Sequence, residues 1–199
     1  MSATTRRAIL AVLAAGAAAP RLALADPASN PLVAKAVAYL DTVNNVKARF
    51  TQSDTRGDVA QGTVYLSRPG RARFEYDPPS GLLITSDGRT VTLTDTRLKT
   101  FQRIPLTSTP LAVFLADHVR LDRGAQITRV DPSADGFSIT ARDTRNLAGG
   151  EITLYFSNSP MRLTGWAIID AQARTTRVSL GAFSPMGAQP DSFFTQGPA

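Results

Sequence analysis

The apolar residues of this chain recur with a helical spacing in two segments and alternate with polar residues in most of the chain after residue 45. Residues 30–43 are predicted to form a helix, because Asn30 suits the N-cap and Pro31 suits the first helical position. Residues 109–118 are predicted to form a second helix, with Thr109 as its cap. Both helices have one apolar face. These faces consist of Leu32, Val33, Val37, Leu40 and Val43 in the first helix, and of Leu111, Phe114 and Leu115 in the second.

Short segments with an apolar residue at every second position predict β-strands. In residues 71–76, for example, Ala72, Phe74 and Tyr76 fall on one face, while two arginines and a glutamate fall on the other. Gly, Pro, Asp and Asn residues separate the segments and predict turns, of which Asp87-Gly88 has the clearest hairpin signature. The predicted strands are 46–51, 59–68, 71–76, 82–86, 90–94, 99–104, 126–130, 136–143, 151–157, 162–170 and 175–184.

About eleven strands joined by short connections predict a mainly β fold, built on one meandering antiparallel sheet with a few helices. A sheet of this size twists and curls towards an incomplete barrel. No linker or internal repeat divides residues 26–199, so they are predicted to form a single domain.

Residues 1–25 have the pattern of a cleaved secretory signal peptide. Arg6 and Arg7 precede an apolar stretch rich in alanine, which is shorter than the roughly 20 residues needed to cross a bilayer. Residues 23–25 read Ala-Leu-Ala, a typical cleavage site, immediately before Asp26. The paired arginines suit both the general export route and the twin-arginine route, and the sequence does not decide between them.

The first prediction concerns this cleavage. N-terminal sequencing of the exported protein should begin at Asp26, because the small residues of the cleavage site end there. A mature chain that still contains Met1 or Arg21 would contradict the signal-peptide interpretation.

Charge and composition argue against two classes of function. The formal net charge of +6 falls to +3 for residues 26–199, because three arginines and no acidic residue lie in residues 1–25. This modest, scattered positive charge does not favour nucleic acid as a partner. The chain has no cysteine, which excludes disulfides, thiolate nucleophiles and attachment of a lipid to an N-terminal cysteine.

Catalytic motifs are absent from the sequence. His118 is the single histidine, no G-x-S-x-G motif surrounds a serine, and no cluster has the spacing of metal ligands. Carboxylate-only catalysis is left open by Glu75, Asp77, Asp87 and Asp95, but all four lie at predicted turns or on a polar strand face. The sequence therefore favours a binding protein without cofactor or metal over an enzyme.

Four segments resemble, in order, the outer-membrane lipoprotein carrier proteins of the LolA family. They are Phe-Thr-Gln at 50–52, GTVYLSRPGRARFEYDPP at 62–79, LLITSDGRTVTL at 82–93 and TPLAVFL at 109–115. The resemblance extends over residues 26–199 and implies an incomplete antiparallel barrel with an α-helical lid. One departure is Ala72, where the family usually has a bulky apolar residue.

The resemblance also implies a function. A monomeric periplasmic carrier would bind the acyl chains of outer-membrane-directed lipoproteins in the apolar half-barrel. It would accept them from an inner-membrane ABC-type release complex and pass them to an outer-membrane acceptor of the LolB type, where one exists. The alternatives are a carrier of another lipid or apolar ligand on the same fold, and a periplasmic hydrolase that uses carboxylates.

Arg68 is the candidate latch residue that the resemblance implies. At the rim of a curled sheet, its guanidinium is expected to donate hydrogen bonds to carbonyl groups of the lid, near Leu40, Leu111, Phe114 and Leu115. The sequence alone favours a solvated arginine at the end of a strand, and the resemblance reverses that preference.

The candidate lining of the lipid cavity is the apolar face of the predicted strands. Core and cavity would share this face, so the alternation does not separate the two roles. The candidate residues are Phe50, Val64, Leu66, Phe74, Tyr76, Val91, Leu93, Ile139, Leu154, Phe156 and Trp166.

Overall fold

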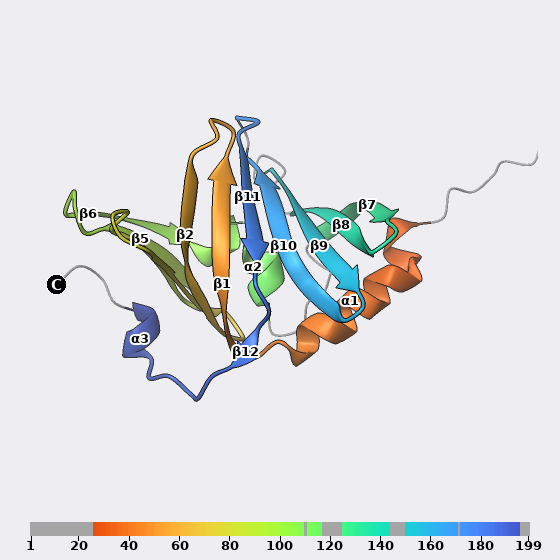
Figure 1. Ribbon diagram of the computed structural model, residues 1–199, viewed down its shortest axis with the longest axis horizontal. Helices are drawn as coiled ribbons and strands as arrows, with labels where there is room; N and C mark the ends of the chain where they lie inside the picture. Colours follow the sequence, from red (N-terminus) through yellow and green to blue (C-terminus); the bar gives the residue numbers. More distant parts are fainter. Residues whose placement is uncertain (1–25, 110, 117–124, 144–149, 171, 196–199) are drawn as a thin grey trace, which may run out of the picture.

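One curved antiparallel sheet forms most of the protein, with helices on its concave side (Figure 1). The computed structural model describes residues 26–109, 111–116, 125–143, 150–170 and 172–195. The predicted signal peptide, residues 1–25, and His118 lie outside the described residues. The strands are β1 (Asn45–Asp54), β2 (Val59–Ser67), β3 (Arg71–Tyr76), β4 (Leu82–Asp87), β5 (Thr90–Asp95), β6 (Thr100–Pro105), β7 (Ala125–Pro132), β8 (Gly136–Asp143), β9 (Glu151–Asn158), β10 (Met161–Ile169), β11 (Thr175–Leu180) and β12 (Ser184–Pro185).

The strand order is β6-β5-β4-β3-β2-β1-β11-β10-β9-β8-β7, and the short β12 also pairs with β1. Consecutive strands are therefore neighbours in two meanders, which meet where β1 pairs with β11. In the described part of the chain, β6 and β7 form the two outer edges, so the sheet is an open half-barrel. This confirms the predicted fold class.

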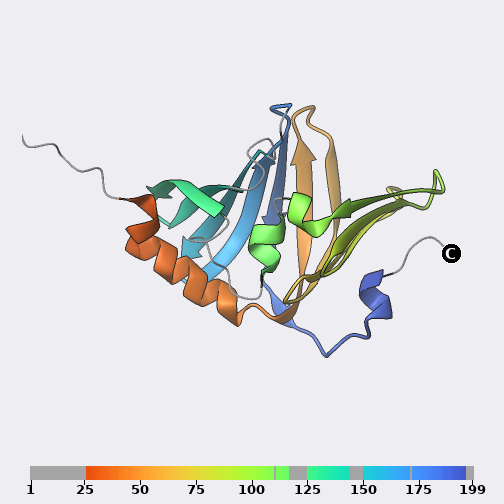
Figure 2. The ribbon, with the colours of Figure 1, turned by 180° about the vertical axis from the view of Figure 1, so that it is seen from behind.

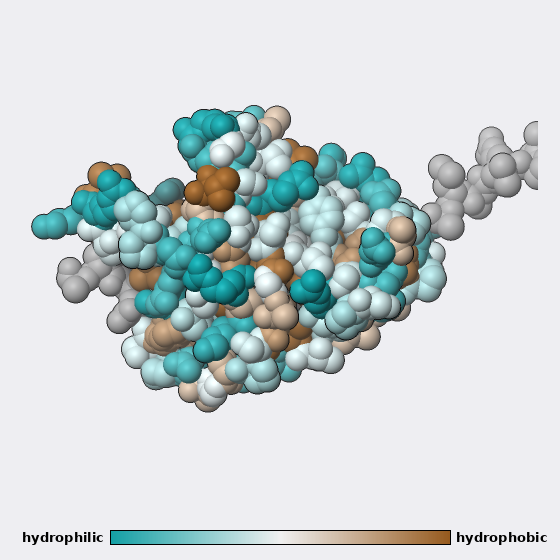
Figure 3. Space-filling model, viewed as in Figure 1, coloured by the Kyte–Doolittle hydropathy of each residue, from teal (hydrophilic) through white to brown (hydrophobic). Residues whose placement is uncertain are grey.

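Strand alternation gives the sheet an apolar concave face, which forms the core, and a mainly polar convex face, which is towards the viewer in Figure 3. In β3, Ala72 and Phe74 are buried on the concave side, and their cross-strand neighbours Leu66 and Val64 of β2 are buried with them. The same alternation of buried and less buried residues continues through β8 to β10. A single hydrophobic core thus fills the hollow of the sheet.

Two helices lie on the concave side of the sheet (Figure 2). Helix α1 (Pro31–Thr42) begins as predicted, since the Asn30 side chain accepts a hydrogen bond from the Leu32 amide at 2.9 Å. Its buried residues Val33, Ala36 and Leu40 face the sheet. Helix α2 (Leu111–Leu115) follows a 3₁₀ turn, η2 (Leu106–Ser108), and its Phe114 and Leu115 are buried. A further 3₁₀ turn, η1 (Pro27–Ser29), precedes α1.

Several predicted boundaries were wrong. The strand predicted at 59–68 ends at Ser67, because residues 68–70 form the turn to β3. The strand predicted at 175–184 divides into β11 and β12, which both pair with β1, because residues 181–183 between them are not in a strand. The Thr109 hydroxyl does not cap α2 but donates to the Leu106 carbonyl of η2. Part of the predicted second helix lies outside the described residues.

A short C-terminal helix, α3 (Ser192–Thr195), was not predicted and packs on the convex face near β3 and β4. Phe193 lies edge-on to Tyr65, with ring centroids 5.1 Å apart, and its carbonyl accepts a hydrogen bond from Arg73 Nη1 at 2.9 Å. Phe194 is fully buried. Arg73 is consequently 7% exposed, although the sequence placed it on a polar face.

No helix in the described ranges is both long enough and apolar enough to cross a membrane.

Candidate functional site

The candidate site is the apolar lining of the half-barrel beneath α1 and α2. Nine of the eleven predicted lining residues are no more than 6% exposed, while Tyr76 and Leu93 are half-buried. The nine come from both meanders and are Phe50, Val64, Leu66, Phe74, Val91, Ile139, Leu154, Phe156 and Trp166. The sheet therefore brings all eleven predicted residues into or against one hydrophobic core.

Aromatic contacts join each helix to the sheet. Phe114 of α2 lies against Trp166 of β10, with ring centroids 5.9 Å apart and a tilt of 33°. Trp166 in turn meets Phe74 of β3 edge-on at 6.2 Å. Tyr39 of α1 meets Phe156 of β9 edge-on at 6.4 Å. These contacts bury apolar ring surface between the helices and the sheet, and aromatic pairs in such geometries add a small stabilisation beyond the burial.

One polar pair interrupts the concave face. The Tyr76 hydroxyl donates a hydrogen bond to Gln52 Oε1 at 2.7 Å. Burial raises the pKa of Tyr76 to about 12, because desolvation disfavours the phenolate more than the hydrogen bond to Gln52 favours it. The hydroxyl consequently stays neutral, and this part of the face carries no charge.

Arg68 connects the ends of both helices to the rim of the sheet. Its Nη1 donates to the Leu40 carbonyl and, at 3.4 Å, to the Val43 carbonyl at the end of α1. Its Nη2 donates to the Ala116 carbonyl, directly after α2, at 2.6 Å. Asp41 Oδ1 lies 3.9 Å from Nη2. The side chain is only 1% exposed, so the solvated-arginine interpretation of the sequence does not hold.

This placement suits a cation. The last carbonyls of a helix have no partner within the helix and carry partial negative charge, which a guanidinium neutralises with several fixed donors. Buried and charge-assisted, these hydrogen bonds are stronger than neutral ones on a surface. Arg68 therefore stabilises the position in which both helices cover the concave face.

The turn that follows Arg68 adds a second contact to α2. The Gly70 amide donates to the Leu115 carbonyl at 2.7 Å, and the Gly70 carbonyl accepts from the Ser86 hydroxyl at 2.7 Å. Gly70 has φ +76°, and a Cβ added there would lie 2.6 Å from Gly88 Cα. The turn approaches its neighbour so closely that only glycine fits.

A second prediction follows from this close approach. Gly70→Ala should lower the free energy of unfolding by at least about 1 kcal/mol more than Gly57→Ala, because the clash adds to the backbone strain. Gly57 is the matched control: its φ is +85°, and nothing lies within 4 Å of an added Cβ. Urea unfolding of both variants measures the difference, and equal losses would show that Gly70 is not sterically confined.

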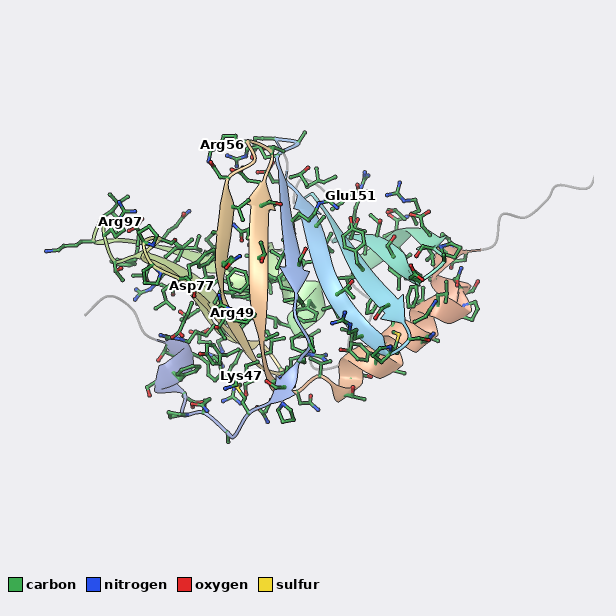
Figure 4. The ribbon with its side chains drawn as sticks, in the orientation of Figure 1. Lys47, Arg49, Arg56, Asp77, Arg97 and Glu151 are labelled. Carbon is green, nitrogen blue, oxygen red and sulfur yellow. The ribbon has the colours of Figure 1, made fainter. Side chains whose placement is uncertain are left out.

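The carboxylates considered for catalysis all have structural partners. Asp77 pairs with Arg49 on the convex face (Figure 4), and this hydrogen bond holds the pKa of the Asp77 carboxyl below its usual value. Glu75 pairs with Arg73 at 2.7 Å. Asp87 and Asp95 each accept hydrogen bonds from two amides of the turns that follow them. Within the described residues, no group of His, Asp and Glu side chains is arranged to hold a metal ion.

The structure also identifies residues of the site that the sequence analysis missed. Tyr39 of α1 is partly buried against the core, but it lies beside the apolar face predicted from the spacing of the apolar residues, so the sequence did not single it out. Val43 and Ala116 contribute carbonyl groups, which leave no signal in a side-chain pattern. Ala72, which the sequence placed on the apolar face but not among the lining residues, is buried between Leu66 and Ser86 on the concave face.

Comparison with known families identifies the family to which this half-barrel belongs. Residues 41–196 match the family model described as outer membrane lipoprotein carrier protein LolA. The chain belongs to the LolA family. An outer-membrane lipoprotein carrier protein from Bordetella avium is 30% identical over 187 residues, covering 86% of this chain and 83% of that protein. A carrier protein of the same name from Chromobacterium violaceum is 31% identical over 126 residues, covering 60% of this chain and 61% of that protein.

In two of the alignments with curated relatives, this chain spans only about half to three fifths of the relative's own length. Among solved structures, a DUF1329 family protein from Desulfovibrio piger is similar to this LolA-family chain with a TM-score of 0.53 and 10% identity. The match covers 85% of this chain and 97% of that one. At this identity, the similarity concerns the fold alone.

Proposed function

We propose that this protein is a periplasmic carrier that binds the acyl chains of lipoproteins on the concave face of its sheet and moves them from the inner to the outer membrane. The observation that carries the proposal is the continuous apolar face beneath two helices whose ends are both held by Arg68. The binding is non-covalent and needs no cofactor. Family membership supports lipoproteins as the cargo.

Complete burial of the acyl chains would bind the cargo too tightly for a carrier that must release it. Each buried methylene contributes about 0.8 kcal/mol, so complete burial of several long chains would reach tens of kcal/mol. Non-covalent affinities saturate near 18–21 kcal/mol, and a carrier must also release its cargo. Part of the burial energy is therefore offset by the cost of opening the lid.

In this proposal, Arg68 raises the free-energy cost of opening the lid. In the empty protein, the guanidinium and the Phe114–Trp166 contact hold the lid over the concave face. Cargo loading breaks these interactions, and cargo release restores them. The arginine thus makes unloading more favourable without touching the acyl chains.

The partners of the proposed cycle are an inner-membrane ABC-type release complex and a LolB-type outer-membrane acceptor, where one exists. The predicted signal peptide supports the periplasm as the compartment. The domain is proposed to act as a monomer, comprising residues 26–199.

A release assay tests the function directly. Spheroplasts that contain a labelled lipoprotein should release it into the medium when the purified protein is added, in a soluble complex of carrier and cargo. The matched control is a variant with a charge on the concave face, Leu154→Asp, whose folding is checked by circular dichroism. Absence of release by the folded wild-type protein would contradict the lipoprotein proposal.

Mass spectrometry of the protein purified from the periplasm distinguishes the cargoes. Lipoprotein-derived acyl chains are expected. Another lipid as the sole bound species would favour the alternative carrier function, in which the small Ala72 admits a different apolar ligand.

A further inference from the structure

The hairpin formed by β5 and β6 projects from the body of the molecule as an arm (Figure 1). Its outer strand, β6, is an edge of the described sheet, and five of its six residues are exposed. Strand β5 pairs with β4 on its other side, whereas in the described part of the chain β6 packs extensively on β5 alone. The concave-face proposal uses Val91 and Leu93 of β5 and gives β6 and the tip of the arm no role.

The exposed apolar residues of the protein concentrate on this arm. Among the described residues, four large hydrophobic side chains are exposed, and two of them belong to the hairpin: Leu98 at its tip, 72% exposed, and Phe101 on β6, 52% exposed. The other two, Val59 and Ile169, lie on separate hairpins. Each of those is close in sequence to aspartates.

The charges on the hairpin beside Leu98 and Phe101 are mainly positive: residues 90–105 contain three cationic side chains and one acidic side chain, Asp95. Arg97, Lys99 and Arg103 are exposed, and within the described residues none of them forms an ion pair with a carboxylate. Arg103 lies over the Phe101 ring, 5.1 Å from its centroid. Arg97 lies on the arm (Figure 4), and its side chain crosses to the neighbouring connection, where it donates to the Pro79 carbonyl at 3.2 Å.

The tip is held in one conformation. Asp95 Oδ1 accepts hydrogen bonds from the amides of Arg97 and Leu98, both at 2.9 Å. The Thr96 amide donates to the Gly81 carbonyl at 3.0 Å, which ties the turn to the neighbouring connection. Leu98 is therefore presented to solvent by an ordered turn, and binding through it would cost little conformational entropy.

We propose that the β5–β6 arm docks the protein on an anionic lipid bilayer. Leu98 and Phe101 enter the boundary between headgroups and acyl chains, while Arg97, Lys99 and Arg103 contact the lipid phosphates. An exposed apolar tip with three cations and only the Asp95 carboxylate beside it complements this surface, because its apolar part gains from burial and its net positive charge gains from the negative surface potential. A protein partner would have to combine an apolar pocket with the same negative rim.

Sedimentation with lipid vesicles tests the proposal on the purified protein without cargo, so the result does not depend on carrier function. The wild-type protein should bind phosphatidylcholine vesicles that contain phosphatidylglycerol, more strongly than phosphatidylcholine alone, and added salt should weaken the binding. Leu98→Ser should reduce affinity about tenfold. Lys99→Glu should reduce it roughly thirtyfold, because one attraction is lost and one repulsion is added.

Two matched controls lie elsewhere on the surface. Val59→Ser removes an equally exposed apolar side chain, and Lys47→Glu makes the same charge change on β1. Both should change affinity less than about threefold, since they lie away from the arm. The proposal is overturned if the wild-type protein does not bind, if binding ignores the anionic lipid, or if the controls weaken it as much as the arm variants do. Release of lipoprotein from spheroplasts by a Leu98→Ser variant would show separately that the carrier function is intact.

Discussion

Arg68→Leu is expected to load acyl chains normally and to deliver them poorly. The substitution removes the donors to Leu40, Val43 and Ala116, which hold the ends of both helices. Hydrogen bonds to charged groups contribute about 1.5–3 kcal/mol each, so the closed state should lose several kcal/mol relative to the open state. Loading buries apolar surface that leucine does not oppose, whereas closure no longer favours release of the cargo. The variant should therefore accumulate in its loaded form.

The measurement compares the release of lipoprotein from spheroplasts with its transfer to isolated outer membranes. Arg73→Leu is the matched control, because it removes a buried arginine from β3 on the opposite face of the sheet, where its partners are Glu75 and Phe193 and not the lid. Only Arg68→Leu should impair transfer. Normal transfer by this variant would show that Arg68 is not a latch, and it would not contradict the carrier function.

Phe114→Asp should open the lid without unfolding the sheet. Removing a buried phenylalanine costs about 3–5 kcal/mol, and a buried unpaired carboxylate costs more. Helix α2 can avoid both costs by leaving the concave face, because its contacts lie only on that side, whereas a core strand has no such alternative. Trp166 is the single tryptophan of the chain and lies beneath Phe114 at 3% exposure. Its fluorescence therefore reports the lid position.

The expected result is a red-shifted Trp166 emission with unchanged β-sheet circular dichroism, together with impaired acyl loading. Val59→Asp, an equally drastic change at an exposed position, should leave the emission unchanged. Collapse of the circular dichroism signal would show that Phe114 belongs to the permanent core and that α2 is not a lid.

The predictable part of the fold was the part encoded in local periodicity. In β3, the alternation of Ala72 and Phe74 with arginines gave the strand and its buried face, and Asn30-Pro31 gave the start of α1. These signals depend on residues that are close in sequence. The apolar character of the concave face followed from the same alternation, which is why the predicted lining residues lie together.

Contacts between distant segments could not be predicted from the sequence. The pairing of β1 with β11 joins residues about 130 positions apart, and no local pattern specifies it. The burial of Arg73 depends on Phe193, which lies 120 residues later in a helix of four residues. The contacts of Arg68 with Val43 and Ala116 use backbone carbonyls, which every residue possesses. Local sequence therefore indicates which face of a strand or helix is buried, whereas only the tertiary structure identifies the distant residues that it contacts.

Quenching of Trp166 by cargo with brominated acyl chains tests the central claim most directly. Bromine atoms quench tryptophan at short range, and Trp166 lies within the proposed binding surface, between Phe74 and Phe114. A lipopeptide with brominated chains should quench the emission strongly, while the same lipopeptide with unmodified chains should bind equally well and only shift it. If the brominated cargo binds and the emission is not quenched, the acyl chains do not enter the concave face and the account is wrong.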